Sequence, residues 1–518
     1  MQDIEDIPLL HQTSDTDDIE AKTSLDFGLR PSKKSVLRSI GSNAICKYAA
    51  RVSRAILYAF VPDVLRINFF HDDSASVKIS PTSWMDSLRG LASLAVFFEH
   101  YFYNFTWTIV VGYGTSDENR HIHQLPPLSL FADGATGVTI FFCISGYVCS
   151  YKALDKSTQH DYAGLCRSLS LSAFRRFFRL YLPVMCSTLC ISVLAYMGVY
   201  EPARGFFSEA PKYFPGPGTE PQPARAASLW LQLRSWAHFV HDLGNPMIEY
   251  PPDPAIDFHL WTIVYEFRST MHLFVALIAL ASCTPGWRIA WLVLLTYVYA
   301  WQWLHWEFVC FFGGAILAQV DVLRKHRLLG STRTTTSKYW HWTNRVIHSA
   351  SLRCLAYCLA IFLLAAPYRI ARGGAGILYE HTVLPLLPHG WYRNRQHYFP
   401  KAIGTLLLMG LLSSTAETKR ASSIWHRVLS SSFTLYLGKL MFALYLMHGI
   451  VLHVFGYALP LVIWDKIGQN GWRYLFGLLV GCLFSLLTTF YVAELWRREV
   501  ELRCQLLTKW IEGHMHVK

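Results

Sequence analysis

Residues 472–496 read WRYLFGLLVGCLFSLLTTFYVAELW, a run in which only Arg473 and Glu494 are charged. An α-helix needs about 20 mostly apolar residues to cross the hydrocarbon core of a bilayer, so this run predicts a membrane-spanning helix. Nine further apolar runs are spanning candidates, at 84–105, 134–154, 178–200, 259–281, 287–304, 306–323, 352–368, 401–416 and 433–457. The sequence therefore predicts an all-α polytopic membrane protein with about ten transmembrane helices.

The composition of the 518-residue chain agrees with a membrane fold. Hydrophobic residues make up 52% of it and charged residues 16%, against roughly 25% charged residues in a soluble domain. The net charge of +12 is typical of nucleic-acid-binding proteins as well, but no basic segment carries a readable nucleic-acid motif. We assign the excess of Lys and Arg to cytoplasmic loops, and we interpret the cysteines, most of them in apolar runs, as buried packing residues.

Loop charges predict the topology, because Lys and Arg concentrate on the cytoplasmic side. The Lys/Arg-rich segments are 155–177, 324–351, 417–432 and the tail from Arg497, which places both termini in the cytoplasm. Residues 1–80 lack a signal peptide and are predicted to form a partly disordered cytoplasmic tail, with a short amphipathic stretch at 56–70. Residues 84–496 form the predicted transmembrane domain and 497–518 a cytoplasmic tail, with the endoplasmic reticulum or another endomembrane as the default location.

The Pro- and Gly-rich loop 201–258 cannot form one long helix. We predict that it is either a lumenal cover or a lid. The chain contains no internal repeat, which argues against an inverted-repeat transporter.

Charged residues inside the apolar runs indicate function, because they are costly in a bilayer. Arg89 and His100 are eleven positions apart on one predicted helix, or roughly 16 Å along its axis and about three turns apart. Two layers follow from this spacing: arginines near the cytoplasm, and acid–base groups towards the outer side. The residues concerned are Arg89, Arg176 and Arg179 in the inner layer, and His100, Glu266 and His448 in the outer layer.

The two layers suit a phosphate-bearing donor and a general base. Guanidinium groups bind phosphate in a bidentate manner, so Arg89, Arg176 and Arg179 are predicted to hold CoA. His100 is the predicted base that deprotonates an acceptor hydroxyl, and an acyl-His intermediate stays open. Glu266 would orient the imidazole or hold the acceptor, with His448 as a further catalytic residue. No metal and no permanently bound cofactor are predicted.

Each of these residues could instead have a purely structural role. Arg89 could snorkel to the interface, and Arg176 and Arg179 could be a positive-inside flank. Glu266 could pair with Arg268 or another intramembrane cation, in the segment DFHLWTIVYEFRSTM that also contains Asp257 and His259. His448 could be a packed, hydrogen-bonded core residue.

Five segments, in this order, resemble acyltransferase family 3, the multi-helix membrane O-acyltransferases, and particularly its fungal branch. They are SLRGLASLAVFFEH (87–100), TIFFCISGYVCS (139–150), FRRFFRLYLP (174–183), HLWTIVYEFRSTM (259–271) and LYLMHGIVL (444–452). The resemblance implies a ten-helix core and transfer of an acyl group, usually acetyl, from acyl-CoA to a hydroxyl. The acceptor would be a secondary metabolite (a polyketide or terpenoid) or a glycan. It also implies that Arg89 and His100 are essential.

The main alternative is a membrane transporter of a small organic solute, which would also need buried charges. A membrane-bound O-acyltransferase of the other type would use His448 with an upstream partner, for which we find no convincing match. The H-x-x-x-D spacing from His238 to Asp242 lies in the Pro-rich loop and is interpreted as a coincidence.

Overall fold

The chain is described here by a computed structural model. The structure describes residues 82–114, 116, 119–209, 213–218, 220–247, 256–328, 349–367, 381–383, 385, 396–416 and 424–515. These residues form helices and no β-strand. The predicted N-terminal tail (1–80) and its amphipathic stretch (56–70) lie outside the described residues.

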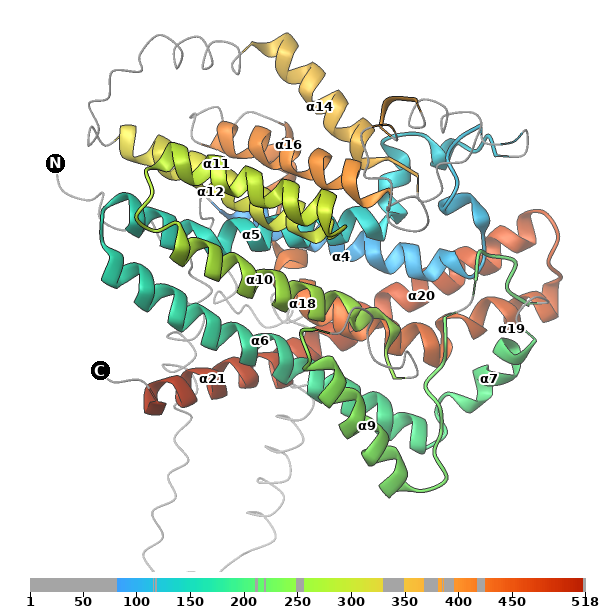
Figure 1. Cartoon of the computed structure of the whole chain (residues 1–518). Helices are drawn as coiled ribbons and strands as arrows, with labels where there is room; N and C mark the ends of the chain where they lie inside the picture. The colour runs from blue at the N-terminus through green and yellow to red at the C-terminus, as the bar shows by residue number, and fades with distance from the viewer. Residues whose placement is uncertain are drawn as a thin grey trace, which may run out of the picture.

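Each of the ten predicted apolar runs contains a helix, and together these form a bundle (Figure 1). They are α4 (Ser83–Tyr103), α5 (Gly134–Thr158), α6 (Tyr162–Tyr196), α10 (Trp261–Ala279), α11 (Pro285–Tyr297), α12 (Glu307–Leu328), α14 (Ala350–Leu364), α16 (Tyr398–Ala416), α18 (Ser432–Val451) and α20 (Trp472–Trp496).

Four helical stretches of the described chain are long and apolar enough to cross a membrane, and they make this a membrane protein. They are Gly134–Thr158, Tyr162–Tyr196, Ser432–Ile467 and Trp472–Met515. The helices α11 and α14 are short, and α4 and α10 carry charged side chains that lower their hydropathy. The all-helical class is confirmed, and ten spans stay a prediction.

Glycines allow the central helices to approach closely. A Cβ on Gly146 of α5 would lie 2.3 Å from the carbonyl oxygen of Phe311 on α12, and one on Gly314 would lie 2.3 Å from that of Cys143. Between α4 and α18, a Cβ on Gly90 would lie 2.5 Å from the amide nitrogen of Gly438. Small residues of this kind are what bring membrane helices together. The contact between α4 and α18 aligns the helices that carry His100 and His448.

The C-terminal segment continues as helix instead of leaving the bundle. A π-helical turn, η10 (Arg497–Glu501), joins α20 to α21 (Leu502–Met515), and α21 lies along α6 in Figure 1. Arg175 of α6 donates to both carboxylate oxygens of Glu512, at 2.7 Å each. The predicted tail is therefore helical through Met515.

Part of the Pro- and Gly-rich loop is fixed to the end of α4. Two helices flank it, α7 (Glu201–Ser208) and α9 (Leu229–Leu243). Between them, the amide of Gly216 donates to the carbonyl oxygen of Asn104 at 2.9 Å. A Cβ on Gly216 would lie 2.0 Å from the carbonyl oxygen of Tyr103, so only glycine fits there. This attachment delivers the next part of the loop to His100.

Candidate active site

The site begins with His100, in the last turn of α4. Its Nδ1 donates to Oε1 of Glu220 at 2.5 Å. His100 is about 20% exposed and Glu220 about 4%, so the carboxylate is buried while the histidine keeps one accessible side. An imidazole held by a carboxylate at Nδ1 presents Nε2 as a base. This is the arrangement that a general base requires.

Glu220 contacts three further side chains through its second oxygen, Oε2. The hydroxyl of Tyr457 donates to it at 2.9 Å, and Nε2 of His259 and of His453 each lie 3.3 Å away. His453 belongs to the π-helical turn η9 (Leu452–Gly456), between α18 and α19 (Ala458–Ile467). Glu220 is thus the hub of the site.

The hub depends on Glu220 being ionised. Burial by itself would raise the pKa of this carboxyl, but the positive charges and hydrogen bonds of His100 and His259 lower the pKa well below its usual value. Glu220 is therefore a carboxylate throughout the range in which an enzyme is assayed, and it acts as an acceptor from every partner.

His259 lies in the short 3-10 turn η5 (Phe258–Leu260) that leads into α10. Its Nδ1 and backbone amide both face Oδ1 of Asp257, at 2.9 Å each. Its ring packs against Gly449, where a Cβ would lie 2.8 Å from Nδ1. The glycine that follows His448 therefore makes room for His259.

His448 completes a cluster of three imidazoles. Its ring centroid is 5.3 Å from that of His100 and 4.5 Å from that of His259, and the latter two are 4.2 Å apart. His448 is 1% exposed. Its Nδ1 lies 2.6 Å from the carbonyl oxygen of Tyr445, which can only accept, so Nδ1 carries the proton and Nε2 is left as an acceptor.

The three-histidine cluster also has a donor set that could hold a metal ion. One ligand atom from each of His100, His259 and His448 lies within 4.8 Å of those of the other two. However, both nitrogens of His259 already face carboxylates, Asp257 at Nδ1 and Glu220 at Nε2. Nε2 of His448, in contrast, has no hydrogen-bond partner among the described residues.

The inner layer is built around Arg176 of α6. It donates to Oε1 of Glu266 at 2.5 Å and to Sγ of Cys149 at 2.9 Å, and Ser145 donates to the same Glu266 oxygen at 2.8 Å. Arg179 lies close enough to Arg176 and Arg89 for their charges to repel. The arginines predicted to share one layer are therefore neighbours.

The position predicted for Glu266 needs correction. The structure does not bring it to His100: it lies in the arginine layer, because it follows His259 by seven residues along α10, or roughly 10 Å. Of the two structural alternatives, a pair with Arg268 is wrong, because Arg268 donates to Glu307 at 2.6 Å, whereas a pair with another intramembrane cation is what Arg176 provides. His100 and His448, in contrast, lie together as expected.

The sequence alone does not indicate Glu220, His453 or Tyr457 as site residues. Glu220 is the single acid in the stretch PGPGTEPQP (215–223), and it is 120 residues from His100. An acid isolated in a rigid Pro/Gly loop was the available signal, but its partner is visible only in three dimensions. His453 follows His448 by five residues, and a π-helical turn places it at Glu220.

The bundle of apolar helices encloses buried acid–base groups and a cluster of arginines. This combination is typical of a membrane enzyme that transfers a chemical group between two substrates. The model of acyltransferase family 3, described as an acyltransferase domain, matches residues 82–492, and the chain belongs to this family. The protein is an acyltransferase, which favours the enzyme over the transporter alternative. A comparison with solved structures found no match.

Three fungal proteins are similar to most of this chain. The O-acetyltransferase PaAT-1 of Phomopsis amygdali is 26% identical over 463 residues, covering 86% of this chain and 88% of its own. Acyltransferase R4 of a Phoma species is 23% identical over 76% of this chain and 87% of its own. Acyltransferase clz18 of Cochliobolus lunatus is 24% identical over 81% of this chain and 93% of its own. These relatives support O-acyl transfer.

Proposed function

We propose that this protein transfers an acyl group, most simply acetyl, from acyl-CoA to a hydroxyl of a secondary metabolite or a glycan. One observation supports it above the others: α4 carries both an arginine of the inner cluster, Arg89, and the histidine of the Glu220 hub, His100. Their separation of roughly 16 Å suits a donor whose phosphates bind at one end and whose thioester reacts at the other.

In the proposed reaction, Nε2 of His100 takes the proton of the acceptor hydroxyl. The acceptor oxygen attacks the thioester carbonyl carbon, the C–S bond breaks, and the CoA thiolate recovers the proton from His100. Glu220 holds the imidazole at Nδ1 and stabilises its protonated form. His448, with Nε2 as an acceptor, helps to orient the hydroxyl.

At the inner end, Arg89, Arg176 and Arg179 bind the CoA phosphates. Nε of Arg176 is buried and has no hydrogen-bond partner among the described residues, so it keeps a donor for an anion. Glu266 acts through Arg176, which it orients by their ion pair. This role replaces the contact with His100 expected from the sequence.

The chemistry also sets the topology that we propose. Because acyl-CoA is cytoplasmic, the arginine cluster faces the cytoplasm, and both termini lie on that side of a ten-helix domain. An endomembrane such as the endoplasmic reticulum is the proposed location. Acyl-CoA is a co-substrate, and no cofactor stays bound.

The proposal is tested by following labelled acetyl-CoA in membranes that contain the protein, with an extract of candidate acceptors. Label in an extractable ester, absent from membranes without the protein, supports it and identifies the acceptor. Folded protein that neither binds nor consumes acyl-CoA would refute it.

A further inference from the structure

Carboxylates offset part of the positive charge of the inner arginine layer. Asp86 lies 3.6 Å from Arg89, and Glu266 forms an ion pair with Arg176. CoA carries a diphosphate and one further phosphate, so a site that binds it needs an excess of positive charge. A further cation at the same depth would supply that excess.

The π-helical turn η10, which follows α20, lies at the depth of this layer. Just before the turn, the hydroxyl of Tyr436 on α18 donates to Glu494 at 2.7 Å. Two residues further along α18, Gly438 packs against Gly90, the neighbour of Arg89. The backbone of η10 also contacts α6 and α18. The start of the C-terminal segment therefore lies beside the inner arginines.

Arg497 and Glu501, at the two ends of η10, face this layer. They are four positions apart, so they share one face of the helix. Glu501 is close enough to Arg497, and to Arg179 on α6, for the charges to interact. Its Oε2 is buried and has no hydrogen-bond partner among the described residues. Arg497 and Arg179 therefore approach the same carboxylate from two different helices.

A second pair in the same segment faces the other way. Glu499 accepts from Arg503 of α21 at 2.7 Å, and the side chain of Arg503 is 74% exposed. One Arg–Glu pair of the C-terminal segment thus lies at the arginine layer, and the other lies at the surface. This contrast distinguishes Arg497 from basic residues that only flank a membrane helix on its cytoplasmic side.

Resting on the proposed function, we propose that Arg497 is a fourth donor-binding arginine, which contacts a phosphate of acyl-CoA together with Arg179. Guanidinium groups on two helices can bind one phosphate from two sides, each with two N–H donors. Glu501 keeps the two guanidinium groups near each other. The C-terminal segment, predicted from the sequence to be a tail, is then part of the donor site.

The test compares Arg497→Ala with Arg503→Ala in the full chain, purified in detergent. Titration calorimetry measures binding of acetyl-CoA. Acyl transfer is measured with acetyl-CoA and with S-acetylpantetheine, which has a thioester but no phosphate. Arg503→Ala, which removes an exposed arginine of the same segment, should match the wild type with both donors.

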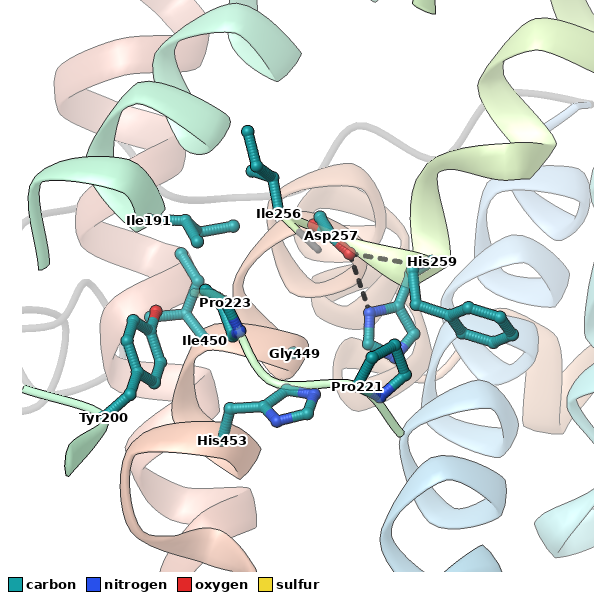
Figure 2. A pocket seen from close by; sticks show the side chains of 11 residues that line it. Ile191, Tyr200, Pro221, Pro223, Ile256, Asp257, His259, Gly449, Ile450 and His453 are labelled. Carbon is teal, nitrogen blue, oxygen red and sulfur yellow. Dashed lines mark hydrogen bonds and ion pairs between the residues drawn. The ribbon is translucent and has the colours of Figure 1, made fainter. Parts of the chain in front are cut away.

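We expect Arg497→Ala to weaken acetyl-CoA binding and to raise its KM by about tenfold or more, the loss of a charge-assisted hydrogen bond. The kcat with acetyl-CoA and the transfer from S-acetylpantetheine should be unchanged. The reason is that the substitution leaves the outer end of the site intact, where Asp257 and His259 bond each other (Figure 2). Arg497→Lys keeps the charge and should recover part of the acetyl-CoA binding.

Unchanged acetyl-CoA binding in Arg497→Ala would overturn the inference, and the proposed function would stand if the Arg176→Ala, Arg179→Ala variant still lost binding. An equal loss with both donors, or no recovery in Arg497→Lys, would also overturn the inference, because either result assigns Arg497 a structural role. Binding that changes as expected, without acyl transfer by the wild type, would refute only the proposed function.

Discussion

Nδ1 of His100 and Oε1 of Glu220 lie 2.5 Å apart, although 120 residues separate them in the chain. The contact joins the end of α4 to a Pro/Gly-rich loop, and Gly216 fixes that loop against Tyr103. The loop predicted to be a cover or a lid thus supplies a buried part of the candidate active site. The following expectations depend on this geometry.

Glu220→Gln should keep the loop in place but remove the charge that stabilises protonated His100. We expect kcat to fall by about 10²–10⁴-fold, the range for a lost or misoriented general base. Because the pKa of Glu220 is already well below its usual value, the acidic limb of the wild-type pH–rate profile belongs to the histidines. Loss of the carboxylate should move that limb to lower pH.

Glu201→Gln, in the same loop but paired with Arg204, is the control and should retain activity. An unshifted pH–rate profile in Glu220→Gln would show that Glu220 has only a structural role.

Gly449→Ala should displace the ring of His259, because the added Cβ would lie 2.8 Å from its Nδ1. We expect a loss of acyl transfer of at least tenfold with acyl-CoA binding unchanged, since the arginine cluster is remote. Gly286→Ala is the control, because its Cβ would meet nothing within 4 Å. Equal activity of the two variants would show that the position of the His259 ring does not affect acyl transfer.

The double substitution Arg176→Ala, Arg179→Ala should weaken acyl-CoA binding at least tenfold, measured by titration calorimetry on purified protein. Loss of Arg176 also leaves the part-buried Glu266 without its ion-pair partner, which destabilises the fold, so Tm must be followed in parallel. Arg179→Ala alone keeps the Arg176–Glu266 pair, so its effect on acyl-CoA binding does not include the loss of that pair. Arg167→Ala, on the exposed start of α6, is the control and should bind acyl-CoA normally. Unchanged acyl-CoA binding in the double variant would exclude Arg176 and Arg179 as the CoA site.

A metal chelator should leave acyl transfer unchanged, because the proposed chemistry uses His100 as a base and not as a ligand. The measurement is activity after 1,10-phenanthroline, with the metal content of the purified protein determined alongside. Inhibition that Zn²⁺ reverses would reassign His100, His259 and His448 to a metal centre.

The sequence predicts the helices well because long apolar runs have few alternatives in a bilayer. Each expected run contains a helix, and His100 and His448 meet because α4 and α18 pack through Gly90 and Gly438. The number of membrane spans is harder to predict from the sequence, because α11 and α14 are short and α4 carries charged side chains that lower its hydropathy.

The sequence does not predict the partners of the charged residues. Glu266 was expected near His100 because both were assigned to the outer half of the bundle, but the pairing with Arg176 depends on how α6 lies against α10. Glu220 could not be assigned at all, because a loop without periodicity gives no indication of the surface it contacts.

The most direct test of the account compares His100→Ala with His241→Ala, whose side chain is 81% exposed on α9. Both variants and the wild type would be given labelled acetyl-CoA and the acceptor identified from the extract. The account predicts that His100→Ala binds acetyl-CoA normally but forms ester at least 10²-fold more slowly, while His241→Ala matches the wild type. Ester formation by His100→Ala at the wild-type rate would contradict the account.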